Sequence, residues 1–276
     1  MSESASSTTL AGTRVHCYGL GELGLPLANR LQAAGAEVSG FDTDPQALAR
    51  WQVGPAVVPV HPPHVVLLCV THEAASRSVI GERMASWAPD TLVIEHGTVS
   101  PQCARETAAR CRRAGLRYVD APLSGGAEGA RRGTLVAMLG VEPHDHRAVL
   151  PVLSAYCAHV EPVGMPGDGQ TCKLANQLAI AGIAAGLAVA QRFALANGLS
   201  LDAVFNALSH GSAHSVQLER LKLKLCEPTV PATERFAWLH KDLEHCAEVS
   251  ITSQPLVQLW RALWDTPSTS FQDSVS

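Results

Sequence analysis

The sequence lacks the signatures of several common classes of functional site. Its eight cysteines include no Cys-x-x-Cys pair, and no His-Glu-x-x-His stretch occurs, so we expect no metal site. The absence of a Gly-x-Ser-x-Gly motif disfavours a Ser-His-Asp hydrolase. With 21 basic and 25 acidic residues, the chain has no electrostatic reason to bind nucleic acid.

Long hydrophobic runs and targeting segments are missing as well. The longest apolar run, residues 178–190, is shorter than the about 20 residues that a membrane span needs, so we expect a buried helix and no membrane partner. The Ser/Thr-rich start, residues 1–9, has no basic region followed by an apolar core and is expected to be a loose tail. Cysteines scattered through apolar segments favour a reducing, cytoplasmic location.

Short apolar segments alternate with helical patterns through the first 160 residues or so. Such strands separated by helices predict parallel pairing with right-handed crossovers, which is a doubly wound Rossmann sheet. A ligand of such a sheet lies at the carboxyl ends of its strands. The expected strands are residues 14–18, 37–41, 65–70, 91–95, 116–119, 134–139 and 159–163.

From residue 168 onward no strand is expected. A long helical pattern covers residues 168–197, and shorter ones follow at 201–208, 215–225, 234–250 and 254–264. The predicted fold class is therefore α/β, with an N-terminal Rossmann domain and an all-α C-terminal domain that are joined by a long interdomain helix. The predicted domain bounds are 1–12 for a disordered tail, 13–165 for the dinucleotide-binding domain, 166–265 for the helical substrate and dimerisation domain, and 266–276 for a loose tail.

A glycine-rich turn is the most informative motif. It lies between a strand pattern and a helical pattern. In a dinucleotide-binding turn the first glycine makes the turn, the second lets the backbone approach the phosphates, and the third lets the helix pack close to the strand. The phosphates then lie at the helix N-terminus, where free N–H groups favour negative charge. The alternative is an ordinary buried strand-turn-helix unit without a ligand. The residues expected to bind the cofactor are Gly19, Leu20, Gly21, Glu22, Leu23 and Gly24.

An acidic residue follows in register with this turn. Asp42 ends the next strand pattern about 20 residues later, where a carboxylate can accept hydrogen bonds from a ribose hydroxyl. A carboxylate there would repel the additional phosphate of NADP, and no arginine follows it directly, so we expect NAD to be preferred over NADP. Val70, at the end of the third strand pattern, is expected at the same cofactor-binding edge.

Three polar residues interrupt the start of the long apolar helix. Lys173, Asn176 and Gln177 are spaced i, i+3 and i+4, so they share one helix face. Lys173 is either a solvated residue near the start of the helix or a group directed into a cleft. In a cleft it could protonate a developing alkoxide during carbonyl reduction and accept that proton during oxidation.

Two further segments could contribute to a site. Residues 120–126 read Asp-Ala-Pro-Leu-Ser-Gly-Gly after a strand pattern, and the Ser124 hydroxyl with the unobstructed N–H groups of Gly125 and Gly126 suits a carboxylate. A plain Pro/Gly turn is the alternative. Lys241 begins a Lys-Asp-Leu stretch; it is either part of a surface ion pair or a second lysine at the cofactor side of the cleft.

These four segments, in this order, resemble the β-hydroxyacid dehydrogenase family, which includes 3-hydroxyisobutyrate and tartronate-semialdehyde reductases. The resemblance spans about residues 14–264. It implies a metal-free, NAD(P)-dependent interconversion of a 3-hydroxy acid and its semialdehyde by a homodimer or higher homo-oligomer. Residues 124–126 would hold the carboxylate of a small substrate. Lys173 would be the general acid/base, and Asn176 would orient the substrate and the lysine. Thr98 and Lys241 would contact the nicotinamide side.

The chain departs from the family pattern at several positions. Gln177 stands where the family usually has a second Asn, and we place it with the substrate-binding residues. Residues 95–97 read Glu-His-Gly in place of the usual Asp-x-Ser, two common methionines of the glycine motif are leucines, and the family's closing segment is not recognisable. These departures bear on the identity of the substrate more than on the chemistry.

Two alternative functions share this fold. An imine reductase usually has Asp or Tyr at the lysine position, so Lys173 argues against it. A cofactor-binding homologue without catalysis is disfavoured because Lys173, Asn176 and Ser124 occur together. Gly182 and Gly186 allow close helix packing, either within one chain or at the seam of a dimer.

Overall fold

The computed structural model describes residues 9–51, 61–226 and 236–264 of the 276-residue chain. By their internal contacts the residues form two compact units, Met1–Lys173 and Leu174–Ser276. The division falls inside one helix, α7 (Asp168–Ala196), whose first turns belong to the first unit. Residues 1–8 and 266–276, which are expected to be tails, lie outside the described residues.

The first unit is built on an eight-stranded sheet with the order β2-β1-β3-β4-β5-β7-β6, and β8 also pairs with β7. The first five strands are mutually parallel in that order, as the sequence predicts. Their bounds, and those of the remaining strands, are β1 Arg14–Tyr18, β2 Glu37–Phe41, β3 Val65–Leu68, β4 Leu92–Glu95, β5 Arg117–Asp120, β6 Leu123–Ser124, β7 Leu135–Gly140 and β8 Cys157–Gly164.

The sheet departs from the predicted parallel pairing at one edge. β7 pairs antiparallel with both β5 and β6, and only β8 restores parallel pairing beside it. The two-residue β6 and the one short helix that follows it are too brief for a full crossover, which needs a dozen or more residues, so the chain returns antiparallel. The sheet is therefore mixed, with parallel pairing dominant.

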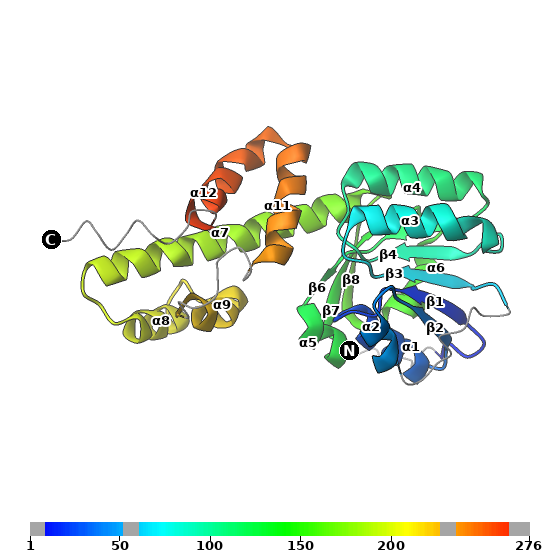
Figure 1. The fold of residues 1–276 in the computed structure, drawn as a ribbon, viewed down its shortest axis with the longest axis horizontal. Coiled ribbons are helices and arrows are strands. Elements are labelled where there is room, and N and C mark those ends of the chain that lie inside the picture. The colour runs from blue at the N-terminus through cyan, green and yellow to red at the C-terminus, as the bar shows by residue number, and fades with distance from the viewer. Residues whose placement is uncertain (1–8, 52–60, 227–235, 265–276) are drawn as a thin grey trace, which may run out of the picture. The chain divides into compact units, whose positions relative to one another are not determined.

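Helices cover both faces of this sheet (Figure 1). Alternate strand residues supply the two cores because successive side chains of a strand point to opposite faces. Val15 and Leu67 pack on the side of α1, whereas Tyr18 and Val66 pack on the side of α3 and α4. The helices of this unit are α1 Gly24–Ala33, α2 Pro45–Arg50, α3 Glu73–Arg83, α4 Pro101–Arg113, α5 Gly126–Arg132 and α6 His146–Leu153, with a 3₁₀ turn, η1, at Met84–Ser86.

The second unit is helical, and its described residues contain no strand. Beside the rest of α7 it holds α8 Leu201–His210, α9 Val216–Cys226, α11 Ala237–Val249, η2 Ile251–Ser253 and α12 Gln254–Trp264. These helices match the predicted ones closely because each carries its own apolar periodicity. Its core includes Leu174, Phe205, Leu243 and Trp260.

Helix α7 is long and apolar enough to cross a membrane by length and composition alone. A core helix passes the same test, and α7 packs one face in the core of the second unit through small residues such as Ala181, Ala184 and Ala188. Only 33% of its most apolar window is buried, so α7 is a partly buried helix and not the buried one that the sequence predicts.

Candidate active site

The glycine-rich turn between β1 and α1 has the geometry that its sequence predicts. Gly19 has φ +93°, and a Cβ there would lie 2.5 Å from the carbonyl oxygen of Cys69. A Cβ on Gly24 would lie 1.8 Å from the carbonyl oxygen of Gly19, so only glycine lets α1 start this close to β1. A Cβ on Gly21 would meet nothing within 4 Å, which leaves its backbone open to a ligand. The cradle fits a dinucleotide pyrophosphate.

Asp42 lies one residue beyond β2 and supports this turn. One carboxylate oxygen accepts a hydrogen bond from the Leu20 N–H at 2.6 Å, and the other accepts one from the Asp44 N–H at 2.9 Å. Because each carboxylate oxygen carries two lone pairs, Asp42 can still accept hydrogen bonds from a ribose. The hydrogen bond from Leu20 therefore fixes the glycine turn and Asp42 relative to each other without a bound cofactor.

The loop after β4 carries Thr98 and is held by hydrogen bonds to the residues before and after Thr98. Buried Glu95 accepts hydrogen bonds from the hydroxyl of Ser76 on α3 and from the N–H of Gly97, the latter at 2.9 Å. The Gln170 amide of α7 donates to the Gly97 carbonyl at 2.9 Å and accepts from the Val99 N–H at 3.2 Å. The half-buried Thr98 thus lies between two residues with fixed backbones.

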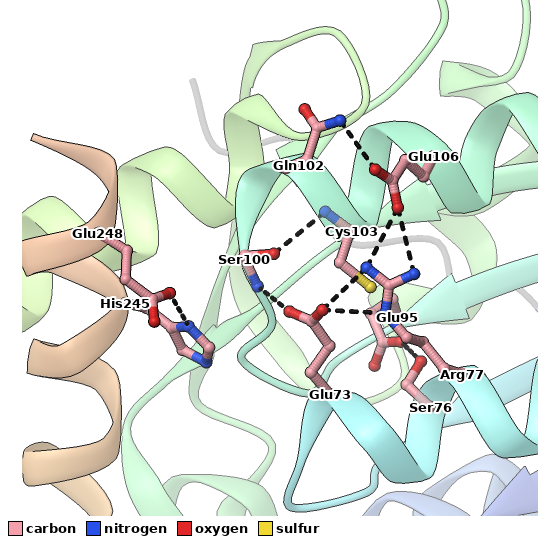
Figure 2. A network of polar contacts seen from close by, with 10 residues as sticks. All are labelled: Glu73, Ser76, Arg77, Glu95, Ser100, Gln102, Cys103, Glu106, His245 and Glu248. Atoms are coloured by element: carbon pink, nitrogen blue, oxygen red, sulfur yellow. Dashed lines mark hydrogen bonds and ion pairs between the residues drawn. The ribbon is translucent and has the colours of Figure 1, made fainter.

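A second polar network holds the far end of this loop (Figure 2). The Glu73 carboxylate accepts the Ser100 N–H at 2.9 Å and pairs with Arg77, which also contacts Glu106. Partial burial would raise the pKa of Glu73, but the hydrogen bonds from Ser100 and Arg77 outweigh it and lower that pKa. Ser100 also caps α4 by accepting the Cys103 N–H at 3.1 Å.

Buried His96 joins this loop to the next strand. Burial lowers its pKa to about 4, so the ring is neutral at pH 7. Its Nδ1 lies 2.7 Å from the carbonyl oxygen of Ala121 and must carry the proton, and its Nε2 then accepts from the hydroxyl of Tyr156 at 2.9 Å. The segment that leads to Ser124 is held in place by this contact.

Asp120, at the end of β5, anchors the start of α7. Its side chain is fully buried, and its two oxygens accept the N–H groups of Gly167 at 2.7 Å and Gln170 at 2.8 Å. Burial raises the pKa of Asp120 to about 6, although these N–H donors oppose the shift. A Cβ on Gly140 or Gly169 would lie within 2.7 Å of this carboxylate, so the two glycines make room for it.

Lys173 follows one turn after Gln170. Its Nζ donates a hydrogen bond to the carbonyl oxygen of Leu123 at 2.8 Å, and its side chain is partly buried. Leu123 directly precedes Ser124, and Gly125 and Gly126 follow with φ of +130° and +68°. The structure thus brings the lysine of α7 to Leu123, 50 residues earlier in the chain, and so to the Ser-Gly-Gly segment that follows it.

Val70 lies in the first unit beside the glycine turn, where its backbone nitrogen is 3.2 Å from a Cβ built on Gly19. The three remaining predicted residues, Asn176, Gln177 and Lys241, belong to the second unit. Gln177 is buried and accepts a hydrogen bond from the Asn176 amide at 3.0 Å, while its own amide donates to Asp242 at 2.6 Å. Lys241 Nζ lies 3.5 Å from the other oxygen of Asp242. These four residues form one polar cluster inside an otherwise apolar helical core.

Four residues that shape these sites were not assigned a role from the sequence. They are Glu95, Asp120, Gln170 and Asp242, and all are buried. Polar residues directly after apolar strand patterns give a usable signal for Glu95 and Asp120. Gln170 and Asp242 contact partners more than 60 residues away, which no local pattern reports. Within the described ranges, no group of three or more His, Cys, Asp or Glu side chains could hold a metal ion.

The doubly wound sheet, the open glycine turn and the acidic residue after β2 define a dinucleotide-binding domain. Comparison with known proteins agrees. Residues 14–164 match the NAD binding domain of 6-phosphogluconate dehydrogenase, and residues 167–270 match the NAD-binding domain of NADP-dependent 3-hydroxyisobutyrate dehydrogenase. The chain belongs to the β-hydroxyacid dehydrogenase family.

Individual relatives support this assignment. A probable 3-hydroxyisobutyrate dehydrogenase of Mycobacterium tuberculosis is 30% identical over 248 residues, which cover 84% of this chain and 83% of the relative. An NAD-dependent L-serine dehydrogenase of Pseudomonas aeruginosa is 31% identical over 210 residues, or 73% and 70% of the two chains. The solved structure of M. tuberculosis 3-hydroxyisobutyrate dehydrogenase with L-serine has a TM-score of 0.77 and 27% identity, over 91% of this chain and 93% of that one.

Proposed function

We propose that this protein interconverts a small 3-hydroxy acid and its semialdehyde, with Lys173 as the general acid/base. The observation that carries the proposal is the hydrogen bond from Lys173 Nζ to the carbonyl oxygen of Leu123, beside the Ser-Gly-Gly segment. The nicotinamide cofactor, when bound, supplies the hydride chemistry. The contribution of the chain is to hold the substrate and to move one proton between Lys173 Nζ and the substrate oxygen.

The substrate carboxylate is assigned to residues 124–126. Ser124 offers a hydroxyl, and a Cβ on Gly126 would meet nothing within 4 Å, so its backbone is accessible. A carboxylate held there would place a hydroxyl two carbons away within reach of Lys173. L-serine, the ligand of the M. tuberculosis structure, carries this pairing of a carboxylate and a 3-hydroxyl.

A panel of 3-hydroxy acids, assayed by the absorbance of NADH, tests the proposal. Oxidation of one or more members is the expected result. Turnover of a cyclic imine without any hydroxy acid would instead select an imine reductase, and tight NADH binding without any turnover would select a non-catalytic homologue. Either result contradicts the proposal.

We propose NAD as the preferred cofactor because the Asp42 carboxylate lies at the glycine turn. We expect kcat/KM for NAD to exceed that for NADP by about tenfold or more, since like charges repel. Asp42→Asn should reduce this preference, whereas Asp44→Asn, which removes a nearby exposed charge, should not. Steady-state kinetics with both cofactors measures this. A wild-type preference for NADP would contradict it.

We also propose that the protein is a soluble, cytoplasmic homodimer that associates through α7. Beside its buried face, α7 exposes a second, apolar face in the second unit that includes Ile183, Val189 and Phe193, the last 69% exposed. A Cβ on Gly182 or Gly186 would meet nothing within 4 Å, so a second helix could approach closely there. A second copy of this chain suits the face because two-fold interfaces pair a patch with itself.

Phe193→Glu is expected to convert this dimer to a monomer, because it buries an unpaired charge in the interface. Leu195→Glu provides the control, since Leu195 is similarly exposed on the same helix but points away from that face. Sedimentation equilibrium measures both variants. A wild-type monomer, or a Phe193→Glu variant that remains a dimer, would contradict the proposed interface.

A further inference from the structure

We propose that Asp242 and Gln177 are positioning residues that fix the direction of the Asn176 amide. This inference rests on the proposed role of Lys173. A carboxylate only accepts hydrogen bonds, so the Gln177 amide must turn its NH₂ group toward Asp242, and the two atoms lie 2.6 Å apart. The carbonyl oxygen of Gln177 then faces Asn176 and accepts its NH₂ at 3.0 Å. The direction of each amide thus follows from one carboxylate.

The consequence for Asn176 is that its carbonyl oxygen points away from Gln177. An amide that donates through its nitrogen on one side presents its oxygen on the other. Asn176 lies three residues after Lys173 on the same helix, where side chains are neighbours. We infer that the Asn176 oxygen is an acceptor for the Lys173 ammonium or for the substrate hydroxyl.

Burial makes this arrangement hard to reverse. Gln177 is 1% exposed and Asp242 is 4% exposed, so neither side chain can exchange its partner for water. One oxygen of Asp242 lies 3.5 Å from Lys241 Nζ and has no hydrogen-bond partner among the described residues. The other oxygen accepts the hydrogen bond from Gln177. A flip of the Gln177 amide would place two oxygens against each other in the core, which is costly.

The length of residue 177 explains why it is a glutamine. Its amide must reach Asn176 on its own helix and Asp242 on α11, 65 residues further along the chain. The asparagine that the family usually has at this position is one methylene group shorter. Glutamine at position 177 therefore completes a chain of two hydrogen bonds that runs from Asp242 through Gln177 to Asn176.

Asp242→Asn is the first test because it keeps the shape and removes the acceptor-only character of the side chain. We expect kcat of the full-length enzyme to fall about tenfold or more and the pH profile of kcat to move, since Asn176 can then turn its NH₂ toward Lys173. Gln177→Met removes both hydrogen bonds without altering Lys241 and should have a similar effect. The double variant should be no worse than the more impaired single variant, because all the changes act through one connection.

A readout without cofactor or substrate accompanies the kinetics. The Asn176 side-chain amide signals of ¹⁵N-labelled protein should shift in both single variants. Ser253→Ala is the matched control: it removes buried hydrogen bonds to the Cys246 and Ser250 carbonyls in the same unit, so it should lower Tm but leave kcat and the Asn176 signals unchanged.

The positioning role of Asp242 and Gln177 and the proposed enzymatic function are contradicted by different results. Folded Asp242→Asn and Gln177→Met variants with kcat within twofold of wild type and the same pH profile would overturn the positioning role, and so would unchanged Asn176 signals. A wild-type protein that oxidises no hydroxy acid would overturn the proposed function, and the amide signals alone would then decide whether the carboxylate sets the direction of Asn176.

Discussion

Lys173→Met is expected to reduce kcat by about 10²- to 10⁴-fold, the range that a general acid/base contributes. Methionine has a similar length and can occupy the same partly buried position, but it cannot exchange a proton with the substrate oxygen. The affinity for NADH should change by less than about twofold, because Nζ bonds to the Leu123 carbonyl beside the Ser-Gly-Gly segment and lies outside the glycine turn.

Turnover assays and fluorescence titration with NADH measure the two quantities separately. Lys222→Met is the matched control, since Lys222 forms an ion pair with Glu219 on the surface of α9. A Lys173→Met variant with wild-type turnover would remove the lysine from the mechanism, and one that loses NADH binding would show that it acts on the cofactor instead.

Asp120→Asn is expected to lower the free energy of unfolding by about 1–3 kcal/mol at pH 7. Asparagine can accept only through its oxygen, so one of the N–H groups of Gly167 and Gln170 loses its acceptor in a buried site and faces an NH₂ group. Because these bonds hold the turn of α7 that precedes Lys173, kcat should also fall, by about tenfold. Chemical denaturation and steady-state kinetics measure both effects.

The pH dependence of this effect has a definite sign. The pKa of Asp120 is raised from 3.8 to about 6 by burial, so between those values the folded chain binds more protons than the unfolded chain. The protonation of Asp120 therefore adds to stability below pH 4, and this added part is lost as the pH rises to about 6. The hydrogen bonds from the N–H groups of Gly167 and Gln170 remain above that pH and give the difference expected at pH 7. The stability advantage of wild type over Asp120→Asn should shrink over that interval; an advantage that grows with pH would contradict it.

The sequence predicts the parts of this protein whose causes are local. The glycine turn follows from steric demands at Gly19 and Gly24 within six residues of each other. The parallel strands β1, β3 and β4 are buried on both faces and read as short apolar runs. The helices of the second unit each show an apolar period. A single chain is sufficient to find such elements.

The remaining features depend on contacts between distant residues. β6 has two residues and exists only because β7 pairs with it, so no periodicity marks it. The antiparallel direction of β7 follows from the short connection between β6 and β7, which is too brief for a crossover to a parallel strand. Gln177 shares a helix face with Lys173, which favoured a substrate contact, yet the structure directs its amide to Asp242. The position of Lys173 was expected near a ligand, but the contact with Leu123 becomes visible only in three dimensions.

The most direct test of the central claim is a crystal structure of the protein with NAD and a bound 3-hydroxy acid. We expect the substrate carboxylate to accept hydrogen bonds from the Ser124 hydroxyl and from the N–H groups of Gly125 and Gly126, with Lys173 Nζ within hydrogen-bond distance of the 3-hydroxyl. A hydroxy acid bound with its hydroxyl beyond the reach of Lys173, while the amine stays on the Leu123 carbonyl, would contradict it.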